Sequence, residues 1–335
     1  LLALATHDHK RGADSRARLA VLSTCTTDWR AAVQRWGRMT AKAGMPMPLP
    51  GAEAYALWQA LVAAWPMHGA PGADFASRME QWLIKALREG KRVSSWSDPN
   101  VAVEEAAAQW LHALLDAAPL QPVRQALATF VARIAPAGAC NGLAQLCLQH
   151  CLPGVPDLYQ GGEGWDLSLV DPDNRHAVDY PARQAWLRDA RTWPTLLEDW
   201  WDGGIKAFLL RQLLDCRRRH PQLFLRGQLQ SLSLPARSPW LAFTRRHEAQ
   251  VLLVIMRRGS PTAMRGPGLH TAHDVGTGVT LRGLPAGPMR NLLDGRIEHF
   301  NATADVGRLL ADSPLAIWIN EETGRDGQQG TTAAD

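Results

Sequence analysis

Several features are scarce or missing in this chain of 335 residues, and each absence narrows what the protein can be. It has no stretch of about 18 uncharged apolar residues, so we expect no membrane-spanning helix and no membrane partner. Charge bias is small, since 36 Lys and Arg oppose 32 Asp and Glu, and no basic face interleaved with aromatics predicts a nucleic-acid partner. What it does contain is 46% hydrophobic residues, enough for a large core and too many for a disordered chain.

Cysteine is also scarce, and its pattern does not suggest a cofactor. The chain has five, which are Cys25, Cys140, Cys147, Cys151 and Cys216. An odd number in a chain of this size favours a reducing, cytoplasmic location. The spacing of residues 140, 147 and 151, beside His150, forms one helical stripe and does not surround a point, so we predict buried thiols and no metal site. No glycine-rich phosphate loop is present, and we predict no cofactor.

The chain opens with an apolar run at residues 1–6 and lacks an initiator methionine or a signal-peptide pattern. Such a run followed by Thr-His-Asp is typical of a core strand with polar residues at its C-terminal tip. We therefore expect the sequence to begin inside a fold.

Residues 14–135 have the pattern of an all-helical block. An apolar face predicts a helix over residues 74–89 and is formed by Phe75, Met79, Trp82, Leu83 and Leu87. Asp98 and Pro99 predict the start of another helix, with Asp98 as the N-cap. We expect the helices to be interrupted at residues 136–138, which read Pro-Ala-Gly.

After this block we expect a buried helix at residues 141–151, a short strand at 155–160, a loop at 163–175 rich in carboxylates, and further helices. The residue pattern then changes to short runs rich in β-forming residues, separated by glycines and prolines. These runs lie at residues 240–244, 251–256, 278–281 and 316–319. This spacing predicts an antiparallel β-sandwich over residues 223–322, followed by a disordered tail at 323–335.

Two predicted strand tips carry dense polar groups, at residues 6–11 and at 159–161 leading to 171–175. Strand tips at the C-terminal face form the active site of a parallel α/β barrel. Carboxylate, imidazole and guanidinium groups together suit a polyhydroxylated substrate. Two structural alternatives remain open at this point: a satisfied His-Asp pair, and an ordinary Asx turn in which Arg175 only stabilises the loop.

These segments resemble maltooligosyltrehalose synthases, members of the α-amylase superfamily in glycoside hydrolase family 13. Residues 5–18, ATHDHKRGADSRAR, are similar to that family's His-Asp-Thr-Lys-Arg segment. Residues 153–161, PGVPDLYQG, and 165–175, WDLSLVDPDNR, are similar to its stretch after the last barrel strand. The resemblance extends over residues 1–225.

The resemblance implies the C-terminal part of a (β/α)8 barrel with a large helical insertion, followed by the sandwich. It divides the chain into a late barrel strand at residues 1–13, the insertion at 14–135, and the last strand, substrate loop and helices at 136–222. It also implies conversion of the reducing-end α-1,4 linkage of a maltooligosaccharide into an α,α-1,1 linkage. A nucleophilic Asp and an acid/base Glu carry out such chemistry, and a third carboxylate stabilises the transition state.

By position, the resemblance implies that Asp8 is this third carboxylate and His7 a sugar-binding imidazole. The other implied substrate contacts are Lys10, Arg11, Tyr159, Trp165, Asp171, Asn174 and Arg175. The sequence departs from the family pattern where Gly162 and Gly164 replace larger residues and where His9 replaces Thr. Because glycine has more backbone freedom than other residues, Gly162 and Gly164 make the loop at the edge of the substrate cleft more flexible.

No Asp and Glu pair in this chain has the strand-tip context of a nucleophile and an acid. The resemblance places both on earlier strands, in an N-terminal half of the same enzyme, so we expect the chain alone to be inactive. Two alternatives stay open: another α-glucan-active enzyme, such as a 4-α-glucanotransferase or amylase, and a non-catalytic carbohydrate-binding or partner-binding module. Of the tryptophans outside helical apolar stripes, the best candidates for substrate contact are Trp96, Trp165, Trp200 and Trp201.

Overall fold

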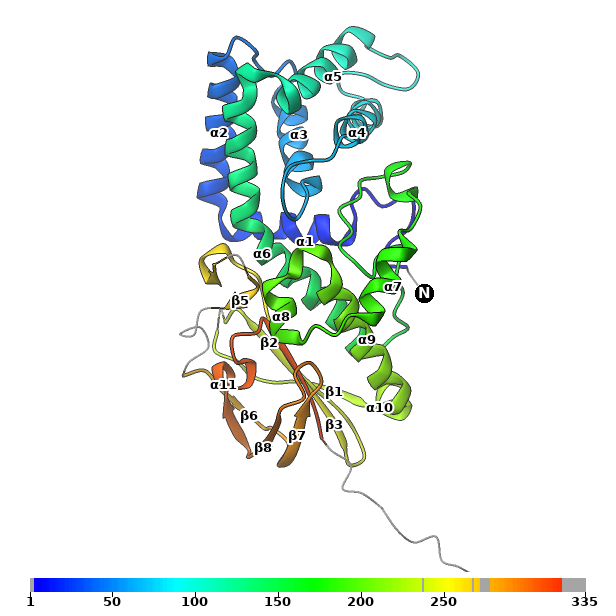
Figure 1. Cartoon of the computed structure of the whole chain (residues 1–335), viewed down its shortest axis with the longest axis vertical. Helices are drawn as coiled ribbons and strands as arrows, with labels where there is room; N and C mark the ends of the chain where they lie inside the picture. Colours follow the sequence, from blue (N-terminus) through cyan, green and yellow to red (C-terminus); the bar gives the residue numbers. More distant parts are fainter. Residues whose placement is uncertain (1–2, 237, 267, 272–277, 321–335) are drawn as a thin grey trace, which may run out of the picture.

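A computed structural model describes residues 3–236, 238–266, 268–271 and 278–320 (Figure 1). The N-terminal half forms a group of helices at the top of the view, and the C-terminal part forms a sheet at the bottom. Helix α6 runs from the upper helices into the centre of the molecule, where it joins the two parts. The predicted tail at 323–335 lies outside the described residues.

The upper part contains only helices. They are α1 (Ala13–Val21), α2 (Thr26–Lys42), α3 (Gly51–Ala64), α4 (Phe75–Gly90), α5 (Val101–Asp116) and α6 (Gln121–Cys151), with 3-10 turns at Leu22–Thr24 and Ala118–Leu120. Their shared core is rich in tryptophan: the rings of Trp36 and Trp58 lie 5.1 Å apart, and those of Trp58 and Trp110 lie 5.5 Å apart. The predicted apolar face of α4 is buried in full, because its spacing places every member on one side of the helix.

The predicted interruption at residues 136–138 is wrong, because α6 continues through Pro136. The proline removes one helical hydrogen bond. Close packing offsets this loss: a side chain on Gly138 would lie 2.9 Å from the Cα of Arg18, so the glycine lets α1 lie directly against α6. The start of α5 also differs from the prediction, since Asn100 and not Asp98 caps it, accepting a hydrogen bond from the Val103 amide.

The two predicted barrel strands are absent from the described residues. Residues 3–6 and 155–160 form no strand, and only an isolated antiparallel bridge joins Arg11 to Leu169. A strand needs a neighbouring backbone to satisfy its N–H and C=O groups. The Leu4 amide instead donates to the carboxylate of Asp157 at 3.1 Å, so a side chain joins these two segments.

The centre of the molecule contains a further group of helices, of which α9 packs directly on α6. They are η3 (Asp173–Arg175), α7 (Tyr180–Arg188), α8 (Trp193–Glu198), η4 (Trp200–Asp202), α9 (Gly204–Arg219) and α10 (Pro221–Arg226). Apolar residues of α6, α8, α9 and α10 form one core with one face of the sheet below them. Buried Arg245 fastens this junction by donating to the carbonyls of Cys151, Phe224 and Gly227, which lie at helix ends.

The C-terminal part is built on a six-stranded antiparallel sheet with the order β1-β2-β3-β10-β7-β8. These strands are Gln228–Ser231, Trp240–His247, Gln250–Arg257, Leu315–Asn320, Gly287–Asn291 and Ile297–Phe300. Two small sheets accompany it, β4 (Met264–Arg265) with β5 (His270–Thr271), and β6 (Thr280–Arg282) with β9 (Thr303–Asp305). The remaining elements are η5 (Pro261–Ala263) and α11 (Val306–Leu310).

The large sheet is covered on both faces, by different kinds of element. Along β3, Leu252 and Val254 pack against the central helices, whereas Leu253 and Ile255 pack against a core that includes β6 and α11. The predicted antiparallel β region is therefore present, with helices over one face and a small sheet and a helix over the other.

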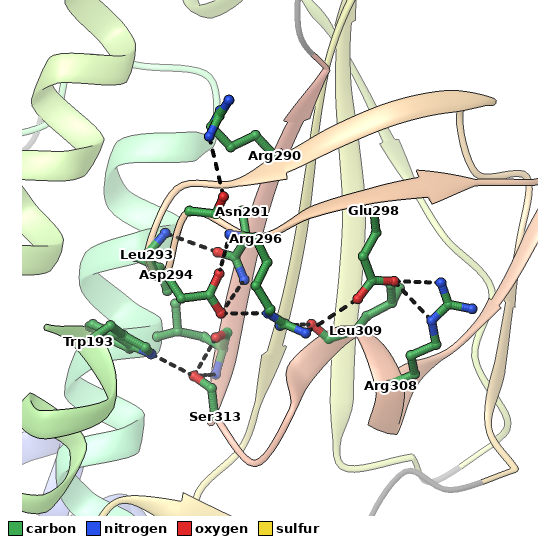
Figure 2. A network of polar contacts seen from close by, with 12 residues as sticks. Trp193, Arg290, Asn291, Leu293, Asp294, Arg296, Glu298, Arg308, Leu309 and Ser313 are labelled. Carbon is green, nitrogen blue, oxygen red and sulfur yellow. Dashed lines mark hydrogen bonds and ion pairs between the residues drawn. The ribbon is translucent and has the colours of Figure 1, made fainter.

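A network of charges holds the edge of this region together (Figure 2). Arg296 donates to Asp294 at 2.8 Å and pairs with Glu298 at 3.3 Å, and Glu298 also pairs with Arg308 of α11 at 2.7 Å. Nearby, the indole N–H of Trp193 donates to the Ser313 hydroxyl at 3.1 Å, which links α8 to the start of β10. These contacts join neighbouring elements, and we assign the network a structural role.

Candidate functional site

The two polar segments predicted from the sequence meet in space. The side-chain amide of Asn174 donates to the His7 carbonyl at 3.0 Å, although the two residues are 167 positions apart. The amide of Asp171 lies 3.4 Å from the same oxygen. The His7-Asp8 segment therefore rests on the loop at 163–175.

The loop is fastened to the start of α1. The backbone carbonyl of Asp166 accepts hydrogen bonds from the amides of Asp14 and Ser15, and its carboxylate accepts one from Ala13. Asp166 thereby satisfies donors that the first turn of α1 leaves without helical partners. Gly12 makes this approach possible, since a side chain there would lie 2.3 Å from the Asp166 carboxylate.

A buried ion pair supports the loop from the other side. The Nζ of Lys206 in α9 lies 2.6 Å from an oxygen of Asp14 and 2.8 Å from the carbonyl of Gly164, with both charged side chains almost fully buried. Burial raises the pKa of Asp14, and the charge of Lys206 opposes this shift. No sequence signal linked these residues, because their pairing depends on α1 and α9 coming together.

Asp173 joins the loop to the helical block. Its side chain is 5% exposed and forms two hydrogen bonds with the guanidinium of Arg78 in α4, at 2.7 and 3.2 Å. It also accepts a hydrogen bond from the Leu169 amide at 2.7 Å. Asp173 and Asn174 are thus largely buried and position the loop, and the predicted substrate contact of Asn174 stays a prediction.

Charged residues that face solvent form a group beside His7, here termed the Asp171 cluster. Its members are Lys10, Lys85, Glu89, Asp171 and Arg175. Arg175 pairs with the carboxylate of Asp171, and Lys85 donates to the Asp171 carbonyl at 2.7 Å. Lys10 pairs with Glu89 at 2.8 Å. The cluster brings together three predicted site residues, Lys10, Asp171 and Arg175.

Lys85 and Glu89 were not predicted as site residues. They stand at i and i+4 on the polar side of α4, opposite the apolar face that the sequence revealed. A polar pair on one helix is usually a solvated surface, so only the folded arrangement identifies these two as neighbours of Asp171.

The side chain of Asp8 is open to solvent. It is 83% exposed, and its carboxylate lies 3.4 Å from the imidazole of His7, which is 50% exposed. The backbone turn here is local, with the Asp8 amide donating to the Thr6 hydroxyl at 3.2 Å. The role of Asp8 as a catalytic carboxylate stays a prediction.

The remaining predicted contacts lie around this group. Tyr159 packs edge-to-face on His9, with ring centroids 5.6 Å apart. The guanidinium of Arg11 lies 5.9 Å from the centre of the Trp82 ring, and burial lowers its pKa. Trp165 is turned toward η4 instead, where its indole donates to the Trp200 carbonyl at 2.8 Å.

The tryptophans proposed for substrate contact divide by burial. Trp200 is 4% exposed and belongs to the central core, so its predicted contact with substrate is wrong. Trp96 is 58% exposed, with the guanidinium of Arg88 5.0 Å from its ring centre, and Trp201 is 38% exposed.

Cys140, Cys147 and Cys151 are core thiols, as predicted from their spacing, whereas Cys25 is only partly buried. Cys140, Cys147, Cys151 and Cys216 are buried and unbridged. Burial raises the pKa of Cys140 and of Cys216 to about 12, which makes both poor nucleophiles. Within the described part of the chain, no cluster of His, Cys, Asp or Glu has the makings of a metal site. Nor does any helix there have the length and apolar character to cross a bilayer.

Comparisons with known proteins place these features in context. No protein-family profile matches the chain. A Mycobacterium tuberculosis protein, from strains CDC 1551 and H37Rv, is named as a maltooligosyl trehalose synthase and is 33% identical over 320 residues. That match covers 95% of this chain and 37% of the mycobacterial protein.

Solved structures agree with this match. A crystal structure of maltooligosyl trehalose synthase has a TM-score of 0.75 at 25% identity, over 95% of this chain and 39% of its own. The Arthrobacter ramosus maltooligosyltrehalose synthase has a TM-score of 0.72 at 29% identity, over 95% of this chain and 38% of its own. The resemblance drawn over residues 1–225 is therefore confirmed, and the similarity extends over 95% of the chain. The chain spans 37% of the length of its curated relatives.

Proposed function

We propose that this chain forms part of a (1→4)-α-D-glucan 1-α-D-glucosylmutase. Such an enzyme converts the reducing-end α-1,4 linkage of a maltooligosaccharide into an α,α-1,1 linkage and leaves a terminal trehalosyl unit. The substrate is thus a maltooligosaccharide, and the reaction is an isomerisation within one molecule. We further propose the C-terminal part of an α/β barrel as the setting, and the cytoplasm as the location.

One observation supports the proposal above the others: the contact of the His7-Asp8 segment with the 163–175 loop. Asn174 and Asp171 both approach the His7 carbonyl, so two polar motifs distant in sequence share one surface. The Asp171 cluster adds cations and carboxylates there. A sugar hydroxyl both donates and accepts hydrogen bonds, and this surface offers partners for each.

The chemistry assigned to the chain is electrostatic. In the proposed mechanism, Asp8 opposes the positive charge that develops on the sugar ring as the glycosidic bond breaks, an interaction stronger in the transition state than in the ground state. His7 and Lys10 donate to hydroxyls of the transferred glucose. Lys10 now pairs with Glu89, and an exposed pair of this kind is worth only about 0–1 kcal/mol, so a substrate can replace it at little cost.

The nucleophile and the acid/base group would come from another part of a longer protein. Retaining enzymes of this chemistry hold their two carboxyl groups roughly 5 Å apart on either side of the bond. We assign neither role to a residue of this chain. The chain alone is accordingly expected to have no turnover, and the N-terminal half of the same enzyme is its proposed partner.

A carbohydrate-binding module without catalysis is the second candidate. The 83% exposure of the Asp8 side chain favours it, since a catalytic carboxylate works best in a site that excludes water. Trp96 and Trp201, at 58% and 38% exposure, offer surfaces on which sugar rings could stack.

A reducing-end assay separates these functions. The full-length gene product is incubated with maltohexaose, and reducing ends and free glucose are followed together. Isomerisation predicts that reducing ends disappear while no glucose is released. A steady rise in reducing ends indicates a hydrolase and contradicts the proposal. Constant reducing ends, with maltohexaose bound, would identify the binding module instead.

A further inference from the structure

A pocket lies apart from the Asp171 cluster, between the helical block and the elements that follow it. Its volume is about 540 Å³, and its walls come from residues 64–78 before and within α4, residues 164–167 of the loop, α7 and η4. Pockets that hold small ligands have volumes of about 300–1,000 Å³. The 163–175 loop separates this pocket from the cluster: Asp173 faces Arg78, which lines the pocket, whereas Asp171 faces Lys85.

An aromatic surface stands at this pocket. The rings of His68 and Trp201 stack with centroids 5.3 Å apart and planes 28° apart, which joins residues 64–78 to η4. Trp201 is 38% exposed, in contrast to the adjacent Trp200, which is buried in the core. The stacked imidazole restrains the indole while part of the ring system stays open to solvent.

A second indole lines the pocket because two glycines make room for it. A side chain on Gly164 would lie 2.7 Å from the ring of Trp186, and one on Gly203 would lie 3.4 Å from it. The Trp186 ring therefore packs directly against both glycines at the wall of the pocket.

Polar groups complete the lining. The Asp74 carboxylate is 70% exposed and meets Arg78 only at 3.8 Å, so its oxygens remain accessible. Asp202 of η4 also lines the pocket, with its carboxylate 36% exposed and paired with Arg191. Flat apolar faces beside carboxylate acceptors match a pyranose ring, which has C–H faces and a rim of hydroxyl donors.

We infer that this pocket is a second α-glucan-binding site, in which Trp201 and Trp186 stack on glucosyl units and Asp74 accepts hydrogen bonds from their hydroxyls. The choice of glucan as ligand rests on the proposed function. Because the loop separates the pocket from Asp8, the site holds long chains without contacting the linkage that reacts. It therefore acts on affinity for long glucans and not on the turnover of short ones.

The test compares three variants of the full-length gene product: Trp201→Ala, His68→Ala and the control Tyr55→Ala. Tyr55 is matched because its aromatic side chain is exposed to a similar extent, 42% against 38% for Trp201, and lies outside the pocket lining. Amylose affinity is measured by retardation in native gels, and turnover by the reducing-end assay with maltotetraose. Far-UV circular dichroism checks that each variant is folded.

Trp201→Ala is expected to weaken amylose binding about tenfold, equivalent to roughly 1.4 kcal/mol of lost contact. His68→Ala should weaken amylose binding less, and Tyr55→Ala should leave it unchanged, while all three variants isomerise maltotetraose like the parent. Unaltered amylose retardation in Trp201→Ala overturns the inference, as does a parallel loss of maltotetraose turnover. If the parent fails to isomerise maltotetraose but its amylose binding still depends on Trp201, the proposed function is wrong and the inferred binding site is supported.

Discussion

Compared with the Asp171 cluster, the ion pair of Asp14 and Lys206 is made of the same kinds of side chain in a different environment. Asp14 and Lys206 are 1% and 4% exposed, whereas Asp171 and Arg175 are 31% and 55% exposed. Both groups fasten the same loop. A buried pair cannot exchange its partner for water or substrate without a large desolvation cost, but an exposed pair can. Burial thus separates charges that hold the loop from charges that are free to meet a ligand.

The largest effect is expected on the buried side. Lys206→Met should lower the free energy of unfolding by about 3–5 kcal/mol, because it leaves the Asp14 charge buried and uncompensated. Urea denaturation measures this. Asp14→Asn combined with Lys206→Met should recover much of the lost stability. If Lys206→Met alone is as stable as the parent, the buried ion pair does not hold the loop as described.

This deficit should also depend on pH. Burial already raises the pKa of Asp14 above its ordinary value of 3.8, and removing Lys206 removes the charge that opposes the shift. A group whose folded-state pKa is raised contributes stability below its unfolded pKa and loses it as pH rises. The Lys206→Met deficit should therefore shrink as pH is lowered toward the ordinary carboxyl range, as followed by urea midpoints across pH.

On the exposed side, Asp8→Asn should act on turnover alone. We expect a loss of about 10²–10³-fold in the full-length gene product, the size of effect seen when one transition-state contact is removed. The unfolding free energy should change by less than about 0.5 kcal/mol, since the side chain is mostly solvated. Kinetics with maltohexaose and thermal melts measure the two quantities, and near-normal turnover would remove Asp8 from the mechanism.

A smaller effect is expected at Arg175. Arg175→Ala should weaken maltohexaose binding about tenfold, or roughly 1.4 kcal/mol, by removing a donor from the Asp171 cluster. Titration calorimetry measures it. Arg133→Ala is the matched control, because Arg133 is an arginine of similar exposure, 47% against 55% for Arg175, and is paired with Asp28 on the helical block. Equal binding by both variants and the parent would make Arg175 a structural residue.

The last prediction concerns the burial of the cysteine thiols and needs no substitution. Ellman's reagent at pH 8, with mass spectrometry to locate the label, should modify half-buried Cys25 well before Cys140 or Cys216, whose pKa values burial raises to about 12. In urea all the thiols should react together. Labelling of Cys140 as fast as Cys25 in the native chain would show that the centre of the molecule opens readily.

The sequence predicted features that depend on neighbouring residues. The buried face of α4 followed from its spacing, and the cysteine stripe from helical periodicity. Predictions from the sequence were wrong where contacts with residues distant in the sequence determine the secondary structure. Residues 155–160 form no strand, and α6 passes through Pro136, because the neighbouring backbone determines both outcomes.

The site shows the same division. His7, Lys10, Asp171 and Arg175 came from motifs, and the structure brings them to one surface. Lys206 was missed because 192 positions separate it from Asp14. Lys85 and Glu89 were missed because the sequence of one helix does not indicate which residues of other segments lie beside a charged pair on its surface.

A crystal structure of the full-length gene product with a bound maltooligosaccharide tests the proposed role of Asp8. We expect the reducing-end glucose to lie against the His7-Asp8 segment, with the Asp8 carboxylate and the Lys10 ammonium within hydrogen-bond distance of it and Asp8 no longer open to water. A sugar bound elsewhere, with the Asp8 side chain still solvated, would contradict this role.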